Sequence, residues 1–342
     1  MRVSMSDLTD DERRDGLTCA VLLLGGLDEL LLAVPALRAV RDQLPRHRLV
    51  LAGRPGVGGA GAAWGLADTW VPARPWHLPR LPGLDVAVNL TDAGPESHRL
   101  LLEQRPRRLV ATANAEAGVP GPHWSLREGG ERPMLEHRTA RWCRVVAASF
   151  HIDVDPRDGL LAPAGRPRSG AGQVLVHPGG PPSARWPADR FAAVARALAA
   201  RGLDVRVLGL PGEHDLASDV AARAGLAGDA VRSPGSVGDL TSVVAGSRLV
   251  VAGDTAVGHL AGACAVPGVH IHGRTSPVQR GPLSVARRYR ALYHPPEHAA
   301  GDRDPMLGVE VDEVMAAVAE VLDGAAPPGE GPGRRAGELL AG

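Results

Sequence analysis

The stretch from Leu249 to Pro277 constrains the fold more than any other part of the sequence. Its residues predict a buried strand at Leu249–Ala252, an acidic turn at Asp254, a helix of small residues and a second strand at Val269–His272. A strand followed by Asp-Thr at a helix start leaves backbone N–H groups unpaired, and such a terminus attracts phosphate. The stretch therefore predicts a diphosphate-binding turn.

A second turn of the same design occurs upstream, in "VLVHPGGPPSARWPADRF". Here a strand ends at His177, a loop containing Gly179, Gly180 and Ser183 follows, and a helix begins after Trp186. We expect Trp186 to anchor the core. Two phosphate-binding turns in one half of the chain indicate a nucleotide ligand.

Apolar strands alternate with amphipathic helices along the chain, as in open parallel sheets that are covered on both faces. The fold class predicted is α/β, with two Rossmann-like, doubly wound lobes that face an interlobe cleft. The expected strands are 19–24, 48–52, 85–90, 173–176 and 204–208, besides the two named above, and the expected helices are 29–44, 134–150, 187–200, 213–224, 236–245 and 311–322. The expected divisions are a polar tail (1–16), one lobe (17–150), a Pro/Gly-rich linker (151–172), a second lobe (173–323) and a disordered tail (324–342).

Composition and charge exclude several classes of function. Basic and acidic residues are equal at 38 each, so no net field favours nucleic acid or anionic lipid. All the basic residues are Arg, which fits GC-rich bacterial coding and excludes chemistry that needs Lys. Three scattered Cys indicate neither disulfides nor zinc, and the polar start and short apolar runs predict neither a signal peptide nor a transmembrane segment. We therefore expect a cytoplasmic protein.

Four sequence blocks resemble glycosyltransferase family 9, the heptosyltransferase-like enzymes. They are "LDELLLAVPALRAVRDQLP", "HPGGPPSARWPADRF", "LGLPGEHDLASDVAARAG" and "AGDTAVGHLAGACAVPGVHIHGRTSP", in the family's order and spacing. The resemblance implies a GT-B fold, with the acceptor in the amino-terminal lobe and a nucleotide-sugar, often ADP-heptose, in the carboxyl-terminal lobe. It also implies an inverting reaction without metal or other cofactor.

Within the last block the resemblance implies donor-binding roles for Asp254, Thr255, Ala256 and His259. Thr255 matches the family's diphosphate-binding Thr, and backbone amides beside it could stabilise a departing diphosphate. Ala256 stands where the family has Gly, which restricts how closely the backbone approaches a ligand. The alternative is that Asp254 only caps a helix and His259 is a core histidine.

The resemblance implies two more donor contacts, each with an alternative interpretation. The family has a Lys two residues before a Trp, and here that position is Ala184; Arg185 is adjacent and is either a phosphate ligand or a solvated charge. In "PGEHD" a carboxylate that follows a strand could bind the ribose hydroxyls. Asp215 is the better match to the family and Glu213 the reserve, unless both only favour the first turn of a helix.

The acceptor hydroxyl must lose its proton as it attacks, so a base is required. The family's base is the Asp of a Gly-Asp pair six residues before a Pro, which from Pro35 gives Glu29, with Asp28 where Gly is usual. Asp28 is the base if the motif slips by one residue. The structural alternative is two acids that favour a helix start.

A GxGxxG pattern at Gly56, Gly58 and Gly61 is weak evidence for a dinucleotide, because it follows the second strand and Pro55 interrupts the turn. We expect a flexible acceptor-side loop there instead. The histidines at 77, 98, 123, 137 and 151 are too scattered to predict a metal site.

The function predicted is transfer of a sugar, with a heptose as one candidate, from a nucleotide-diphosphate donor to a hydroxyl or amine of a small molecule or glycolipid. An ADP-sugar is the donor expected from the family alone. The alternative is a nucleotide- or nucleotide-sugar-binding protein whose catalysis is impaired by the departures at Asp28, Ala184 and Ala256.

Overall fold

The computed structural model describes residues 16–91, 94–122, 136–161, 172–285, 288–295 and 305–323. The chain divides into two compact units, Met1–Gly159 and Leu160–Gly342, and this boundary falls within the stretch predicted as a linker. We call them unit 1 and unit 2. Residues 162–171 of that linker, His123, the C-terminal tail and the N-terminal tail up to residue 15 lie outside the described residues.

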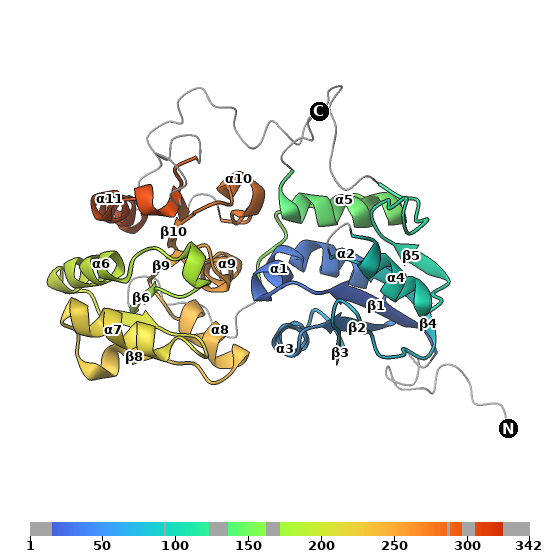
Figure 1. Cartoon of the computed structure of the whole chain (residues 1–342), viewed down its shortest axis with the longest axis horizontal. Coiled ribbons are helices and arrows are strands. Elements are labelled where there is room, and N and C mark those ends of the chain that lie inside the picture. The colour runs from blue at the N-terminus through green and yellow to red at the C-terminus, as the bar shows by residue number, and fades with distance from the viewer. Residues whose placement is uncertain are drawn as a thin grey trace. The chain divides into compact units, whose positions relative to one another are not determined.

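Unit 1 contains a parallel sheet of five strands in the order β3-β2-β1-β4-β5, which is the order of a Rossmann-like half (Figure 1). The three expected strands of this unit are confirmed to within one residue at each end. The elements of unit 1 are β1 (Thr18–Leu23), α1 (Leu27–Leu32), α2 (Val34–Gln43), β2 (Arg48–Gly53), α3 (Pro55–Ala63), β3 (Thr69–Pro72), β4 (Leu84–Asn89), α4 (Pro95–Glu103), β5 (Arg108–Val110) and α5 (Arg138–Phe150).

The sheet of unit 1 is buried on both faces. Successive side chains of β1 point to opposite faces, and both sets are buried. Ala20 and Leu22 belong to an apolar cluster that includes Leu100 and Leu101 of α4. The alternate residues Cys19, Val21 and Leu23 are also fully buried. A continuous apolar run such as "CAVLL" is therefore what this central strand requires.

Two expectations for unit 1 are wrong in detail. The helix expected at 29–44 is two helices, which meet at Ala33, because Pro35 lacks an N–H and its ring crowds the preceding turn. The glycine-rich segment expected as a loop is helix α3, with Pro55 in its first turn. Close packing explains the glycines, since an added Cβ at Gly58 would lie 2.7 Å from the ring of Trp70.

Unit 2 contains a parallel sheet of six strands in the order β11-β10-β9-β6-β7-β8, the same winding with one strand more. The two-lobed α/β fold class is thus confirmed. Its elements are β6 (Val174–His177), α6 (Ala188–Ala200), β7 (Val205–Leu208), α7 (His214–Ala224), β8 (Val231–Arg232), α8 (Val237–Ala245), β9 (Leu249–Gly253), α9 (Ala256–Ala263), β10 (Gly268–Ile271), α10 (Pro277–Arg280), β11 (Tyr289–Leu292) and α11 (Val311–Asp323).

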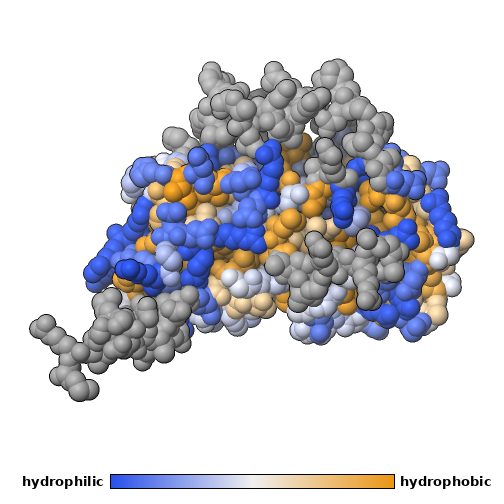
Figure 2. Space-filling view, turned by 180° about the vertical axis from the view of Figure 1, so that it is seen from behind, coloured by the Kyte–Doolittle hydropathy of each residue, from blue (hydrophilic) through white to orange (hydrophobic). Residues whose placement is uncertain are grey.

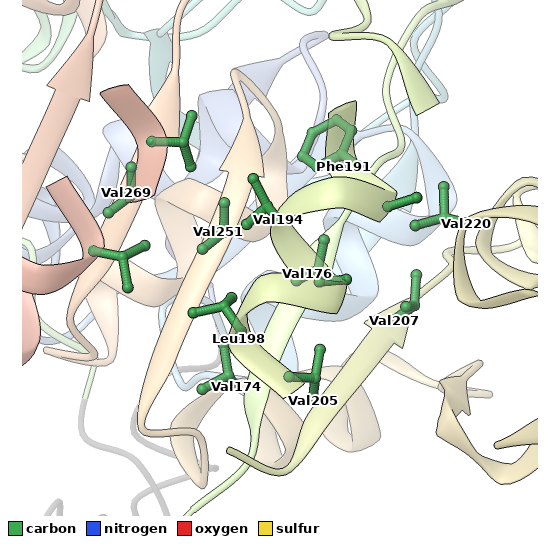
Figure 3. Packing of buried hydrophobic residues seen from close by; sticks show 14 of the residues in the cluster. Val174, Val176, Phe191, Val194, Leu198, Val205, Val207, Val220, Val251 and Val269 are labelled. Atoms are coloured by element: carbon green, nitrogen blue, oxygen red, sulfur yellow. The ribbon is translucent and has the colours of Figure 1, made fainter. Parts of the chain in front are cut away.

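In the core of unit 2, valines of the strands pack with apolar residues of α6, α7 and α11 (Figure 3). Trp186 is 1% exposed, as expected of a core anchor; its indole Nε1 donates to Val309 O at 2.9 Å. Its ring meets Phe191 edge to face, with centroids 5.0 Å apart. This packing fixes where the loop after β6 ends and α6 begins.

The three cysteines, Cys19, Cys143 and Cys264, are free and buried. Among the described residues, no helix combines the length and apolarity that crossing a membrane requires. On the face shown in Figure 2, hydrophilic residues are spread widely between the apolar ones. Trp76 is the most exposed of the large apolar side chains described, at 74%.

Candidate active site

The two predicted phosphate-binding turns of unit 2 lie next to each other. Strands β6 and β9 are paired, with His177 opposite Ala252, so their carboxyl ends adjoin at the point where the strand order reverses. Thr255 is the N-cap of α9, and Gly180 has a positive φ of 110°. An added Cβ at Gly180 would lie 3.1 Å from Thr255 Cγ2, so the two turns are in contact.

Thr255 carries a buried hydroxyl at the start of α9. Its Oγ1 has no hydrogen-bond partner among the residues that the structure describes, and the side chain makes no cap bond to its own helix. A buried polar group is normally hydrogen-bonded, so a buried hydroxyl without a protein partner at a helix start suits an oxygen ligand. Phosphate oxygens are ligands of this kind.

Glu213 ties the loop after β7 to the loop after β6. Its Oε1 accepts from the amide of Gly180 at 2.8 Å and its Oε2 from the amide of Leu210 at 3.0 Å. An added Cβ at Gly179 would lie 2.2 Å from Glu213 Oε2, so a side chain there would displace the carboxylate from these two amides. Glu213 therefore shapes the glycine loop directly.

His177 is fully buried at the end of β6. Its Nδ1 donates to Leu208 O at 2.9 Å, and its Nε2 lies 3.9 Å from Glu213 Oε2. Burial, the largest effect, lowers the pKa of His177 despite this hydrogen bond and the nearby carboxylate. The neutral imidazole of His177 thus links the end of β6 to the end of β7 and lies beside Glu213.

The remaining residues expected on this side are arranged less closely. Arg185 Nε donates to Gly180 O at 2.6 Å, so this guanidinium braces the glycine loop. Ser183 and Ala184 lie in a short 3₁₀ turn, Pro182–Ala184, and Ser183 is exposed. Asp215 is exposed in the first turn of α7, whereas Glu213 is half-buried against the loop.

Asp254 is held among buried histidines. His259 Nε2 lies 3.5 Å from its Oδ1 and His272 Nδ1 lies 3.9 Å from its Oδ2. His272 Nε2 in turn is 2.5 Å from the hydroxyl of Tyr289, and His270 meets that ring edge to face. These contacts join α9, β10 and β11 beneath the N-terminus of α9.

Electrostatic interactions keep Asp254 charged, and burial keeps His270 and His272 neutral. Burial acts to raise the pKa of Asp254, but the hydrogen bond to His259 and electrostatic interactions with His272, His259 and Arg280 lower it to about 2. Burial lowers the pKa of His272 to about 4, although Asp254 acts to raise it. Burial likewise lowers the pKa of His270 well below its usual value.

A cavity of about 550 Å³ opens in unit 1 at the carboxyl ends of β1 and β4, again where the strand order reverses. Its size is in the range of small-molecule sites. Apolar and charged side chains share its wall: Leu24, Gly25, Glu29, Arg54, Pro75, Leu90, Thr91, Gly94, Glu96, Ser97, Arg138 and Trp142.

Glu29 lines this cavity, and Asp28 is not among its lining residues. The Glu29 side chain is 12% exposed, and its Oε1 accepts from Arg138 Nη1 at 2.7 Å. Asp28 lies beside Gly26, where an added Cβ would be 2.4 Å from Asp28 Oδ1. Of the two acids in the first turn of α1, the structure thus presents Glu29 to the cavity.

Several cavity residues were missed by sequence reasoning. Thr91 joins the ends of β1 and β4, since its Oγ1 donates to Leu22 O and accepts from the amide of Leu24. Buried Asn89 donates from Nδ2 to Ser97 Oγ at 2.9 Å. The available signals were a polar residue that ends an apolar strand, Asn89 in β4, and a polar residue shortly after it, Thr91, whereas nothing local indicates Arg138.

No cluster of three or more His, Cys, Asp or Glu side chains in the described part of the chain could hold a metal ion.

Residues 169–305 match the family model described as Glycosyltransferase family 9 (heptosyltransferase). This region is a glycosyltransferase family 9 domain. It contains both turns that the sequence predicts to bind phosphate, together with Glu213 and the Asp254 cluster.

Solved structures of glycosyltransferase family 9 share the fold of the whole chain. The family 9 glycosyltransferase of Veillonella parvula DSM 2008 superposes with a TM-score of 0.71 at 15% identity, covering 92% of this chain and 99% of that one. The E. coli heptosyltransferase WaaC with ADP gives 0.67 at 16% identity, covering 89% and 99%. E. coli ADP-heptose lps heptosyltransferase II gives 0.64 at 15%, covering 89% and 98%.

No curated protein matches the sequence. The two-lobed fold of GT-B type is nevertheless shared with these structures across both units.

Proposed function

We propose that the protein transfers a sugar from a nucleotide-diphosphate donor bound by unit 2 to a hydroxyl or amine of an acceptor bound in the unit 1 cavity. The observation that carries the donor side is the buried, unpaired Thr255 hydroxyl at the start of α9, in contact with Gly180. An ADP-sugar, with a heptose as one candidate, is favoured because WaaC is described with ADP and with ADP-2-deoxy-2-fluoro heptose.

Charge develops on the leaving diphosphate as the sugar departs. The amides at the start of α9, the Thr255 hydroxyl and the positive end of the helix supply fixed donors for that charge. A preorganised site of this kind stabilises the leaving group without a divalent ion. We therefore propose a metal-independent reaction.

Glu29 is the proposed general base. The acceptor attacks the anomeric carbon as it loses a proton, and one direct displacement inverts that carbon. The base must lie where the acceptor binds, and Glu29 lines the cavity of unit 1. The acceptor is a small molecule or the exposed part of a glycolipid, since the cavity holds about 550 Å³.

The decisive experiment is a transfer assay with ADP-, UDP- and GDP-sugars and a panel of hydroxylated and amino acceptors. Glu29→Gln keeps the shape of the side chain but removes the proton acceptor, so transfer should fall by about 10²–10⁴-fold with little change in donor binding. Asp28→Asn should cost less. Full activity of Glu29→Gln in an active protein would refute the assignment, and loss in Asp28→Asn alone would move it by one residue.

A nucleotide-binding protein with impaired catalysis is the second candidate. It is favoured by one observation: the family's Lys is replaced by Ala184, and the neighbouring Arg185 directs its Nε to its own loop at Gly180 O. Such a protein would bind a nucleotide-sugar yet release no nucleotide from it with any acceptor.

For either function we propose a cytoplasmic location, which the three unpaired cysteines support.

A further inference from the structure

Glu29 is one methylene longer than the aspartate that the family motif leads one to expect, and this raises the question of how its carboxylate is held. A glutamate has three side-chain torsions, so an unrestrained carboxylate samples many positions around a helix start. A general base, by contrast, has to lie within hydrogen-bond reach of the proton that it removes.

Two contacts restrain the Glu29 side chain from opposite ends. At its base the side chain lies against the bare backbone of Gly25, where an added Cβ would be only 2.3 Å from Glu29 Cγ. At its tip Oε1 is 2.7 Å from Arg138 Nη1. Gly25 and Arg138 both line the cavity that Glu29 faces.

Arg138 differs from the other arginines of α5 in what it binds. Arg144 forms two 2.8 Å hydrogen bonds with Glu136, and Arg141 lies 3.5 Å from the same carboxylate. Arg138 instead bridges 109 positions of sequence to reach the first turn of α1. It is 26% exposed, which leaves the pair partly screened by solvent rather than sealed in a core.

We propose that Arg138 is a positioning residue that fixes the Glu29 carboxylate in the cavity, and that Gly25 provides the space in which the longer side chain lies. A carboxylate has lone pairs on both oxygens, so an ion pair through Oε1 is compatible with accepting a proton from a substrate. This inference rests on the proposed role of Glu29 as the base. It explains how a glutamate serves where an aspartate is expected.

The kinetic test compares Arg138→Ala, Arg138→Lys and the control Arg144→Ala, with the donor and acceptor that the panel assay identifies. Arg138→Ala should lower kcat by about 10²-fold with the donor KM nearly unchanged, because displacement of a reacting group by about 1 Å costs that much. Arg138→Lys should recover part of the loss. Added guanidinium chloride should partly rescue Arg138→Ala and have no effect on Arg144→Ala.

A role through Glu29 also predicts non-additivity. The double variant Glu29→Gln with Arg138→Ala should be no slower than Glu29→Gln alone, because the arginine then has no carboxylate to position. Gly25→Ala should resemble Arg138→Ala, whereas Gly56→Ala, at an exposed glycine with open space around it, should behave like the parent protein. Losses that multiply in the double variant, or a full kcat in Arg138→Ala, would overturn the proposal.

Crystal structures of the parent protein and of Arg138→Ala give a readout that is independent of activity. The Glu29 carboxylate should leave its place in the cavity in the variant; a carboxylate that stays there would refute the positioning role. If Glu29→Gln retains full transfer, or no donor supports transfer, the proposed function fails while these structures still decide whether Arg138 positions Glu29.

Discussion

At the scale of single residues, the structure assigns different tasks to side chains that look alike in the sequence. Glu213 and Asp215 stand two positions apart, and sequence resemblance favours Asp215 as the ribose ligand. In the structure Glu213 accepts from two backbone amides across two loops, while Asp215 is exposed. The carboxylate that orders the site is therefore Glu213.

Glu213→Gln should weaken ADP binding by about tenfold or more, because an amide NH₂ would face one of the two backbone N–H groups that the carboxylate now binds. Asp215→Asn serves as the matched variant and should change affinity little. Isothermal titration calorimetry with ADP decides between them. A larger loss in Asp215→Asn would return the ribose contact to Asp215.

Thr255→Val should also weaken ADP binding by about tenfold, since one hydroxyl that donates to a charged group is lost while the shape is kept. The free energy of unfolding should be nearly unchanged, because the structure shows no protein partner for this hydroxyl among the described residues. Thr241→Val, whose hydroxyl bonds its own helix α8, is the control and should bind ADP normally. Equal ADP affinity in the parent protein, Thr255→Val and Thr241→Val would argue against a phosphate site at Thr255.

At the scale of elements, strands buried on both faces were predictable and edge elements were not. β1, β6 and β9 are continuous apolar runs and were located to within one residue. β11 was missed because an edge strand of half-buried residues, "YRAL", has no such run. α3 was missed because its glycines serve close packing against β2 and β3, which is a tertiary effect.

The same limit applies to the site. Thr255, Gly180 and Glu213 each follow a strand whose end the sequence reveals, so their meeting at one edge of a parallel sheet could be inferred. Arg138 could not be inferred, because its contact with Glu29 spans 109 positions and depends on where α5 packs against α2.

Two buried histidines, His270 in β10 and His272 directly after it, should make the stability of unit 2 depend on pH. His272 has a pKa of about 4 when folded and its ordinary value, 6.5, when unfolded, and the pKa of His270 is lowered further. Between these values the unfolded chain binds the extra protons, so stability is full above about pH 6.5 and is lost as the pH falls toward 4. Each such histidine contributes about 1.4 kcal/mol per pH unit in that window.

Urea unfolding at pH 5, 6 and 7, read by pulse proteolysis of unit 2, measures this slope. His272→Gln cannot titrate and should lower the slope by about 1.4 kcal/mol per pH unit, the share of one histidine, because His270 still titrates. Asp254 does not complicate the comparison, because its carboxyl pKa of about 2 places its own loss of stabilisation below pH 4. A stability that is constant from pH 7 to pH 5 would contradict the prediction.

At the scale of the whole molecule, two units with the same strand winding divide the work between donor and acceptor in the proposed mechanism. ADP should bind the full chain equally in the presence of EDTA and of added Mg²⁺, because the α9 amides and Thr255 supply the donors for the diphosphate. Calorimetry in both buffers tests this. A strict requirement for a divalent ion would refute metal-independent binding.

The three buried cysteines allow the opening of each unit to be measured separately, by the rate at which a reagent labels the thiols. Burial raises the pKa of the Cys19 and Cys143 thiols to about 12 and that of Cys264 to about 11, so a thiol reagent can modify them only when the surrounding structure opens. Cys19 and Cys143 then report the opening of unit 1, and Cys264 that of unit 2. ADP at a hundred times its dissociation constant should slow labelling of Cys264 by about a hundredfold and leave the labelling rates of Cys19 and Cys143 unchanged. This result would show that the nucleotide binds to unit 2, without any knowledge of the sugar or the acceptor.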